Sequence, residues 1–166
     1  FELGRPGGVG APRASLDLAR LIALCHRHGV RFFYDAVMAF SKNDPYQNAA
    51  FLDFHVHHGS GDPEQAGRDG FGGDLFKYEL FLDHCYDPIS GDVRRLCPAR
   101  QWMQLHLAHW MLHYRIDGIR VDSVNNVRSY DFLEEMKDAA RRRWRERAAE
   151  QGLDAGAADE RFLVVG

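Results

Sequence analysis

This 166-residue sequence has few cysteines, no long apolar run and no large excess of charge of either sign. Its three cysteines form no CxxC pair, which argues against a disulfide scaffold and predicts a reducing, cytoplasmic location. No stretch approaches the ~18 unbroken apolar residues of a membrane span, so we expect no membrane partner. The formal net charge of −3 lacks the basic excess typical of nucleic-acid-binding domains. What remains is a globular protein whose 45% hydrophobic residues can form a core.

One basic run, residues 141–147 (RRRWRER), could suggest a nucleic-acid-binding patch. The same predicted helix carries acidic residues that offset the run: Glu134, Glu135, Asp138, Glu146 and Glu150. We therefore interpret this segment as the solvated face of a helix and expect no nucleic-acid partner.

Helices and strands are predicted to alternate along the chain, which favours right-handed crossovers and a parallel sheet. Three strands cannot close a (β/α)8 barrel, which takes ~250 residues, so we expect part of such a TIM barrel, from a larger domain. Helices are predicted to begin at Ser15, Pro98 and Ser129, and strands to cover 30–36, 117–123 and 161–166.

The helix that begins at Pro98 carries an apolar stripe at helical spacing. The stripe consists of Trp102, Leu105, His109 and Leu112. We expect this face to pack into the core, and Trp110 to be buried as well.

Residues 41–97 interrupt the alternation, because they are rich in glycine and proline and show little periodicity. A segment this long between regular elements is typical of an inserted subdomain. Three of its tyrosines, Tyr46, Tyr78 and Tyr86, are candidates for stacking on sugar rings, although many such rings simply pack.

Candidate catalytic residues lie where two predicted strands end, which is where (β/α)8 barrels place their active sites. Asp35 lies at the end of the first strand, and Arg120 and Asp122 at the end of the second. Arg120 and Asp122 are two residues apart, so both project from one face of a strand. An arginine beside a carboxylate keeps it ionised, as a nucleophile requires, but an ordinary ion pair has the same spacing.

Three segments resemble the α-amylase superfamily, glycoside hydrolase family 13. Residues 117–126 (DGIRVDSVNN) resemble its second conserved region, and residues 30–40 (VRFFYDAVMAF) resemble its first. Residues 162–166 (FLVVG) resemble its fifth barrel strand. The resemblance implies that residues 1–40 supply a helix and the third barrel strand, that 41–97 form the irregular domain B, and that 98–166 supply the fourth and fifth strands.

The resemblance also implies a retaining glycoside hydrolase or glucanotransferase acting on α-glucosidic bonds of an α-glucan or oligosaccharide. Asp122 would be the nucleophile that forms the glycosyl-enzyme intermediate, and Arg120 would orient it. Asp35 would support this arginine and the sugar. The acid/base glutamate would follow Gly166, so this chain is expected to be inactive without the remainder of the barrel.

Three positions depart from the family pattern. Ala39 and Phe40 replace an asparagine that often binds calcium and a histidine that touches the sugar, so we expect no cofactor and doubt the calcium site. Asn126 replaces a histidine, as in branching-enzyme-like and isoamylase-like members. Asp35, Phe40 and Asn126 are the expected substrate-binding residues. The altered first region leaves a non-catalytic barrel that binds a glucan or a protein as an alternative.

A further alternative lies in residues 52–58 (LDFHVHH), which resemble the metal-binding strand of amidohydrolases. His55 and His57 could hold one metal ion from one side of a strand. A metal site needs more ligands, however, and no histidine follows either of the other strands.

Overall fold

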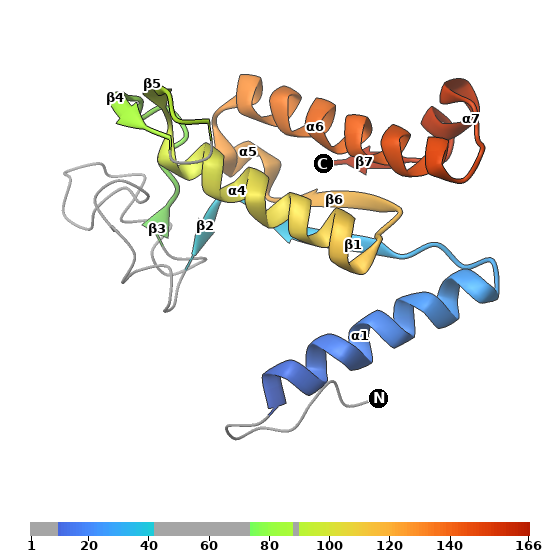
Figure 1. Ribbon diagram of the computed structural model, residues 1–166. Coiled ribbons are helices and arrows are strands. Elements are labelled where there is room, and N and C mark those ends of the chain that lie inside the picture. The colour runs from blue at the N-terminus through green and yellow to red at the C-terminus, as the bar shows by residue number, and fades with distance from the viewer. Residues whose placement is uncertain (1–9, 42–73, 88–89) are drawn as a thin grey trace. The chain divides into compact units, whose positions relative to one another are not determined.

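A computed structural model describes residues 10–41, 74–87 and 90–166, in which helices and strands alternate (Figure 1). The helical elements are α1 (Gly10–Arg27), α4 (Pro98–His109), the π-helical turn η2 (Trp110–Tyr114), α5 (Val124–Val127), α6 (Tyr130–Glu150) and α7 (Ala155–Asp159). The strands are β1 (Phe33–Val37), β2 (Phe40–Ser41), β3 (Asp74–Leu75), β4 (Leu82–Tyr86), β5 (Val93–Leu96), β6 (Gly118–Asp122) and β7 (Leu163–Val165).

The three strands predicted from the sequence form one sheet in the order β1-β6-β7. β6 and β7 run parallel, with Gly118 opposite Leu163 and Arg120 opposite Val165. The predicted mixed α/β fold with a parallel sheet is therefore confirmed. The described part of residues 41–97 contains a β2–β3 pair and a β4–β5 pair, both antiparallel, and the expected domain B stays a prediction.

The chain divides into two compact units. The first unit comprises Phe1–Asp35, His106–Arg120 and Asp138–Val165. The second unit comprises Ala36–Leu105, Val121–Lys137 and Gly166.

Asp117, just before β6, gathers several partners in the first unit. Its carboxylate accepts hydrogen bonds from the backbone N–H of Phe32 (2.8 Å) and the guanidinium of Arg147 (3.1 Å). Its Oδ2 also lies 2.7 Å from His26 Nε2. Burial lowers the pKa of Arg147, and the charge of Asp117 opposes that shift. This cluster joins the end of α1, the start of β6 and α6.

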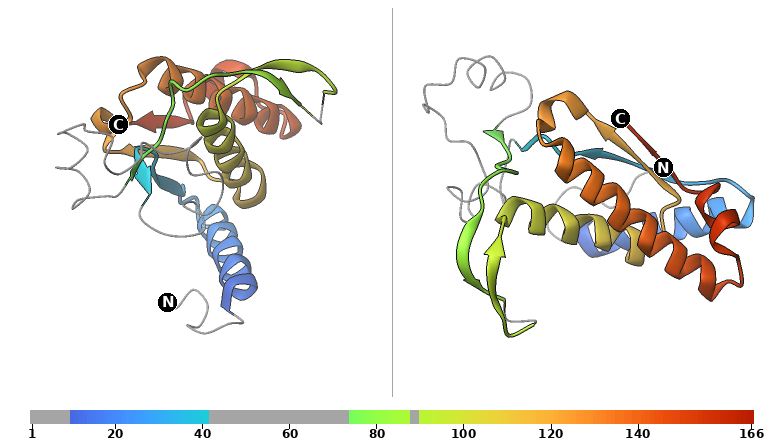
Figure 2. Two further views of the ribbon diagram at one scale, coloured as in Figure 1. Left: turned by 90° about the vertical axis from the view of Figure 1, so that its left-hand side faces the viewer. Right: turned by 90° about the horizontal axis from the view of Figure 1, so that it is seen from above.

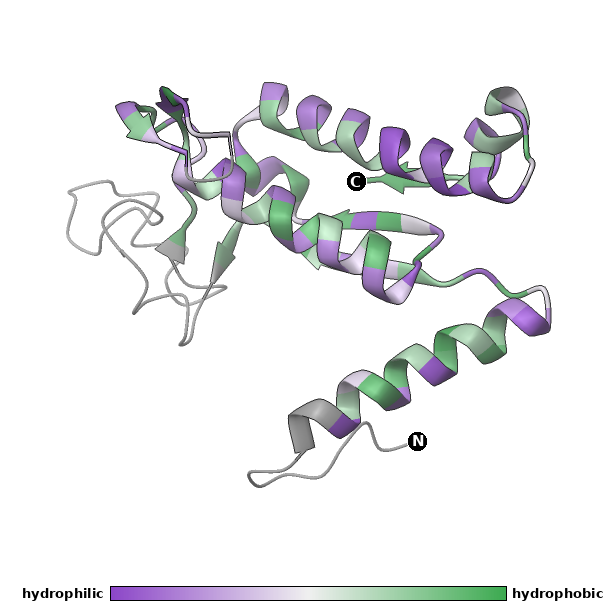
Figure 3. Ribbon diagram, viewed as in Figure 1, coloured by the Kyte–Doolittle hydropathy of each residue, from purple (hydrophilic) through white to green (hydrophobic). Residues whose placement is uncertain are grey.

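The α6 helix packs on α7 in the first unit. The Trp144 indole N–H donates to the carbonyl of Ala158 at 2.6 Å, and its ring stacks on Phe162. Hydrophilic and hydrophobic residues interleave along α6, as Figure 3 shows. Only part of its basic run is a solvated face: Arg145 is exposed and pairs with Asp159 at 2.5 Å, whereas Arg147 is 12% exposed and pairs with Asp117.

Arg100 organises the second unit. Its side chain is 7% exposed, and its guanidinium donates to the carbonyl of Tyr78 at 2.6 Å and to Asp131 at 2.8 Å. Further acceptors are Glu79, Glu135 and the Ser129 hydroxyl. A buried guanidinium needs such a full set of acceptors, and this set ties α4 to the start of α6.

The candidate sugar-stacking tyrosines have different outcomes. Tyr78 is buried, stacks on Phe132 and donates its hydroxyl to the carbonyl of Met38, so it is a packing residue of the second unit. Tyr86 is exposed at the end of β4, in a two-stranded ribbon with β5 (Figure 2). Tyr46 lies outside the described residues.

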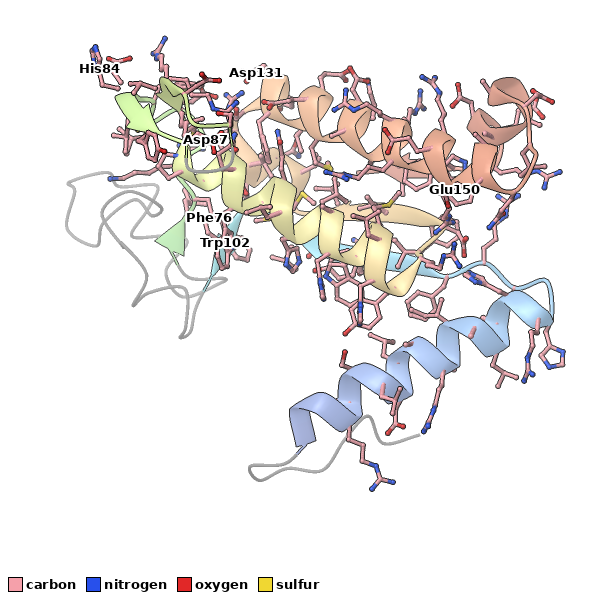
Figure 4. The ribbon with its side chains drawn as sticks, viewed as in Figure 1. Phe76, His84, Asp87, Trp102, Asp131 and Glu150 are labelled. Carbon is pink, nitrogen blue, oxygen red and sulfur yellow. The ribbon has the colours of Figure 1, made fainter. Side chains whose placement is uncertain are left out.

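The predicted packing stripe of α4 is wrong. Trp102 (labelled in Figure 4), Leu105, His109 and Leu112 are exposed. A second set at helical spacing is buried instead: Ala99, Met103, Leu107 and Met111. Because α4 and η2 carry two apolar stripes, periodicity alone could not tell which one packs. Trp110 is half-buried rather than core.

The start of α1 also differs from the prediction. The helix begins at Gly10, five residues before Ser15, and so takes Pro12 into its first turn, where a missing N–H costs nothing. Ser15 is therefore inside the helix, and its hydroxyl is hydrogen-bonded to that of Tyr114 at 2.7 Å. Gly29 adopts the left-handed conformation expected after a helix end (φ 69°).

Replacing Gly118 with alanine should destabilise the first unit. An added Cβ would lie 2.1 Å from Phe33 Cε1 and 2.7 Å from the Leu163 carbonyl oxygen, so the Phe33 ring and the backbone of β7 would have to move. Overpacking of this kind costs about 1–3 kcal/mol of unfolding free energy. The measurement is the thermal midpoint of the full-length protein. Gly156→Ala, where the nearest atom is a side-chain oxygen at 3.3 Å, is the matched control. Equal midpoints for the two variants would contradict the close approach.

The Arg100 cluster should contribute a defined acid sensitivity. The Arg100 hydrogen bond, and then that of Ser129, holds the pKa of Asp131 below its ordinary 3.8. Its native pKa lies below its unfolded value, so this stabilisation is complete above about pH 4 and is lost as pH falls through the native value. Between pH 6 and pH 3, thermal stability should therefore fall less in Asp131→Asn than in the wild type. The thermal stability of the control variant Asp92→Asn, which alters the exposed hairpin, should fall as much as that of the wild type. An equal fall in Asp131→Asn would refute the contribution of the Asp131 carboxylate to acid sensitivity.

Candidate active site

Asp35 and Arg120 meet across neighbouring strands of the first unit. Arg120 Nη1 donates to Asp35 Oδ1 at 2.9 Å and to Oδ2 at 2.7 Å. Asp35 is the third residue of β1, and Arg120 is the third residue of β6. The prediction that Asp35 lies at the end of its strand is therefore wrong. The strand continues to Val37 because alanine and valine extend the apolar run.

Both side chains of this ion pair are accessible. The Arg120 side chain is 52% exposed and that of Asp35 is 61% exposed. The residues on either side of Arg120 in β6, Ile119 and Val121, are buried. The alternation of the strand therefore presents the arginine on one face and packs the apolar residues on the other.

Asp122 ends β6, and the chain turns immediately after it. The side chain is half-buried and has a polar or electrostatic partner. Ser123 adopts the left-handed conformation (φ 55°, ψ 41°), which is unusual for a residue other than glycine. A four-residue helix, α5, follows, and Arg128 directly after it is also left-handed (φ 60°). The candidate nucleophile thus lies at a sharp strand-to-helix turn.

The other expected substrate-binding residues lie in the second unit. Asn126 belongs to α5, where its backbone N–H donates to the Ser123 carbonyl at 2.8 Å. Phe40 belongs to β2 and pairs with Leu75 of β3. Of the named site residues, the structure brings Asp35 and Arg120 into contact, and the roles of all of them stay predictions.

The residues available to hold a metal at the first region do not fit calcium. Ala39 is buried, has no side-chain oxygen, and its carbonyl accepts the N–H of Phe76 at 3.0 Å. His55 and His57 lie outside the described residues. Within residues 10–41, 74–87 and 90–166, no group of three or more histidine, cysteine or acidic side chains is placed to hold a metal. No helix in that part of the chain is long and apolar enough to cross a bilayer.

Sequence reasoning missed an aromatic group that supports β1. Tyr34, directly before Asp35, stacks on Trp110 with ring centroids 4.1 Å apart, and its hydroxyl lies 2.8 Å from His106 Nε2. The Trp110 indole N–H donates to the same nitrogen at 3.2 Å. Burial, and then the charge of His109, lowers the pKa of His106, which favours the neutral ring as acceptor. No local pattern signals these contacts, because Tyr34 and His106 are 72 positions apart in the sequence.

Comparison with known proteins gives a structural likeness. No family model matches the chain, and no curated protein matches it. The solved structure of pullulanase type I from Bacillus subtilis str. 168, complexed with maltose, matches 78% of this chain at 23% identity and a TM-score of 0.57. The α-amylase from Geobacillus thermoleovorans, complexed with acarbose, matches 82% at 18% identity and a TM-score of 0.47. The chain spans 16% of the pullulanase and 32% of the amylase. The structure thus has the fold of part of this pullulanase, a mixed α/β arrangement with a parallel sheet.

Proposed function

We propose that the protein containing this segment is an α-amylase-superfamily enzyme, a retaining glycoside hydrolase or glucanotransferase that acts on α-glucosidic bonds. The observation that carries the proposal is the Asp35–Arg120 ion pair, which joins two motif residues 85 positions apart. The likeness to a pullulanase crystallised with maltose supports an α-glucan or oligosaccharide as substrate. We further propose a cytoplasmic location.

The chemistry follows from the motif residues. Asp122 attacks the anomeric carbon, the bond to the leaving glycosyl oxygen breaks, and a glycosyl-aspartate forms. Asp35 fixes the Arg120 guanidinium, whose positive charge two residues from Asp122 stabilises the negative charge of the nucleophile. A second carboxyl group ~5–5.5 Å from the nucleophile must first protonate the leaving oxygen and then activate water or an acceptor sugar. The resemblance assigns that group to the position after the fifth barrel strand, in the remainder of the barrel.

Two finer assignments belong to the proposal. Asn126, four residues after Asp122, favours a branching-enzyme-like or isoamylase-like specificity. Ala39 and Phe40 keep a second function open, a barrel that binds a glucan or a protein without cleaving it. The observation in favour of that function is that Phe40 lies in the β2–β3 pair and has no group that can donate a hydrogen bond to a sugar.

Trapping the intermediate tests the nucleophile directly. The full-length protein is incubated with an activated fluorinated α-glucosyl fluoride, and peptide mass spectrometry locates the bound sugar. We expect the label on the peptide that contains Asp122, because slow turnover of the trapped sugar leaves the glycosyl-aspartate in place. Asp122→Asn should lose the label and on the order of 10⁴-fold in kcat while keeping its circular dichroism spectrum.

Asp92→Asn serves as the control for an aspartate outside the motifs and should label normally. Label on a different carboxylate would remove Asp122 from the role of nucleophile. Binding of an α-glucan without label or turnover would establish the non-catalytic alternative.

Asp35→Asn should separate function from stability. The Asp35–Arg120 pair is exposed, and exposed ion pairs contribute only ~0–1 kcal/mol to stability. The variant should therefore melt within a few degrees of the wild type but lose roughly 10²-fold in kcat, since Arg120 is no longer held in place. Arg95→Gln, which breaks an exposed ion pair with Asp83 in the hairpin, is the matched control for stability. Unchanged kcat in Asp35→Asn would show that the pair is only structural.

A further inference from the structure

Two exposed histidines lie side by side where α4 passes into η2. His109 is the last residue of α4 and His113 lies in η2. Their ring centroids are 5.1 Å apart and the ring planes differ by 12°. The spacing of four residues places both imidazoles on one face of the helical segment. Packing does not require this pair, because the buried side of the segment is formed by other residues, Leu107 and Met111 among them.

A buried tyrosine, Tyr114, packs against both imidazole rings. The Tyr114 ring meets His109 edge-on at 5.4 Å and His113 edge-on at 4.7 Å. The position of Tyr114 is fixed, because it is buried and its hydroxyl is hydrogen-bonded to Ser15 of α1. Short π-helical turns such as η2 occur frequently at functional sites. The two imidazoles are therefore held close together before any ligand arrives.

The ring nitrogens of the pair remain available. Among the described residues, no backbone or side-chain group hydrogen-bonds to the His109 or His113 imidazole. Neutral imidazole is the preferred protein ligand of the late first-row divalent metals. Two such ligands on adjacent turns of a helix bind one ion more tightly than either does alone, because the second bond forms within the molecule.

We propose that His109 and His113 form a binding site for a late first-row divalent cation, strongest for Cu²⁺. With metal–nitrogen bonds of 2.0–2.1 Å, each ring centroid lies about 3.2 Å from the ion, so two adjacent ligands have centroids roughly 4.5–5.2 Å apart. The observed 5.1 Å lies within this range. Rotation of the exposed rings about their Cβ–Cγ bonds, which is a soft torsion, turns one nitrogen of each toward the ion.

The site supplies two protein ligands, and water completes the coordination. No third histidine, cysteine or acidic side chain joins the pair within the described ranges. Two imidazoles plus water suit the tetragonal geometry of Cu²⁺ or Ni²⁺ better than the closed four-ligand site of structural zinc. This inference is independent of the proposed glycosidase chemistry, because neither histidine belongs to the α-amylase motifs.

Copper titration tests the site. The full-length protein carries His55→Asn, His57→Asn and His58→Asn, so that residues 52–58 offer no imidazole to the metal, and CuCl₂ is added in a non-coordinating buffer. Isothermal calorimetry measures the affinity, and pulsed electron paramagnetic resonance counts the coordinated imidazoles. We expect two imidazoles on one bound Cu²⁺. Further substitution by His109→Asn or His113→Asn should leave one imidazole and weaken binding by about 10-fold or more.

His28→Asn, which removes an exposed histidine after α1, is the matched control and should change neither readout. Circular dichroism confirms that each variant is folded. An unchanged affinity and imidazole count in both His109→Asn and His113→Asn would overturn the proposal, as would a bound Cu²⁺ with fewer than two imidazoles before those substitutions.

Discussion

The pairing of β6 with both of its neighbours is the constraint on which the rest of the first unit depends. Gly118 has no side chain, so the Phe33 ring and the Leu163 backbone can close on the strand from the two sides. Once this register is set, the two-residue period of the strand determines which side chains are buried. Ile119 is buried, and Arg120 lies on the opposite, exposed face. The meeting of Arg120 with Asp35 is thus a consequence of backbone packing at the start of the strand.

Local patterns predicted the strands of this sheet well and its helix packing poorly. β6 and β7 lie within the segments expected from short apolar runs, and β1 overlaps its expected segment but extends one residue beyond it, to Val37. The stripe of α4 was assigned to the wrong side, since two apolar stripes compete on that helix. The β4–β5 hairpin has no clear alternation and a shifted register between Leu82 and Cys85, so its sequence carries little strand signal.

The candidate site was predictable to the extent that its residues lie within short motifs. The resemblance implied that Asp35 supports Arg120, and the two side chains are in contact. The stacking of Tyr34 on Trp110 and its contact with His106 join positions 72 or more residues apart, and no local rule reports such contacts. The left-handed Ser123 was missed for a related reason: serine is not a residue type that signals positive φ, so the neighbouring structure must impose it.

The left-handed residues at both ends of α5 have a consequence for how this region can change in length. Four residues are too few to form a stable helix on their own, and α5 is bounded by the left-handed residues Ser123 and Arg128, at which the chain changes direction. One inserted or deleted residue would rotate the downstream chain by about 100° around the helix axis. Ser129 would then turn away from Arg100, and the start of α6 would lose its anchor. The segment between β6 and α6 therefore behaves as a spacer of fixed length.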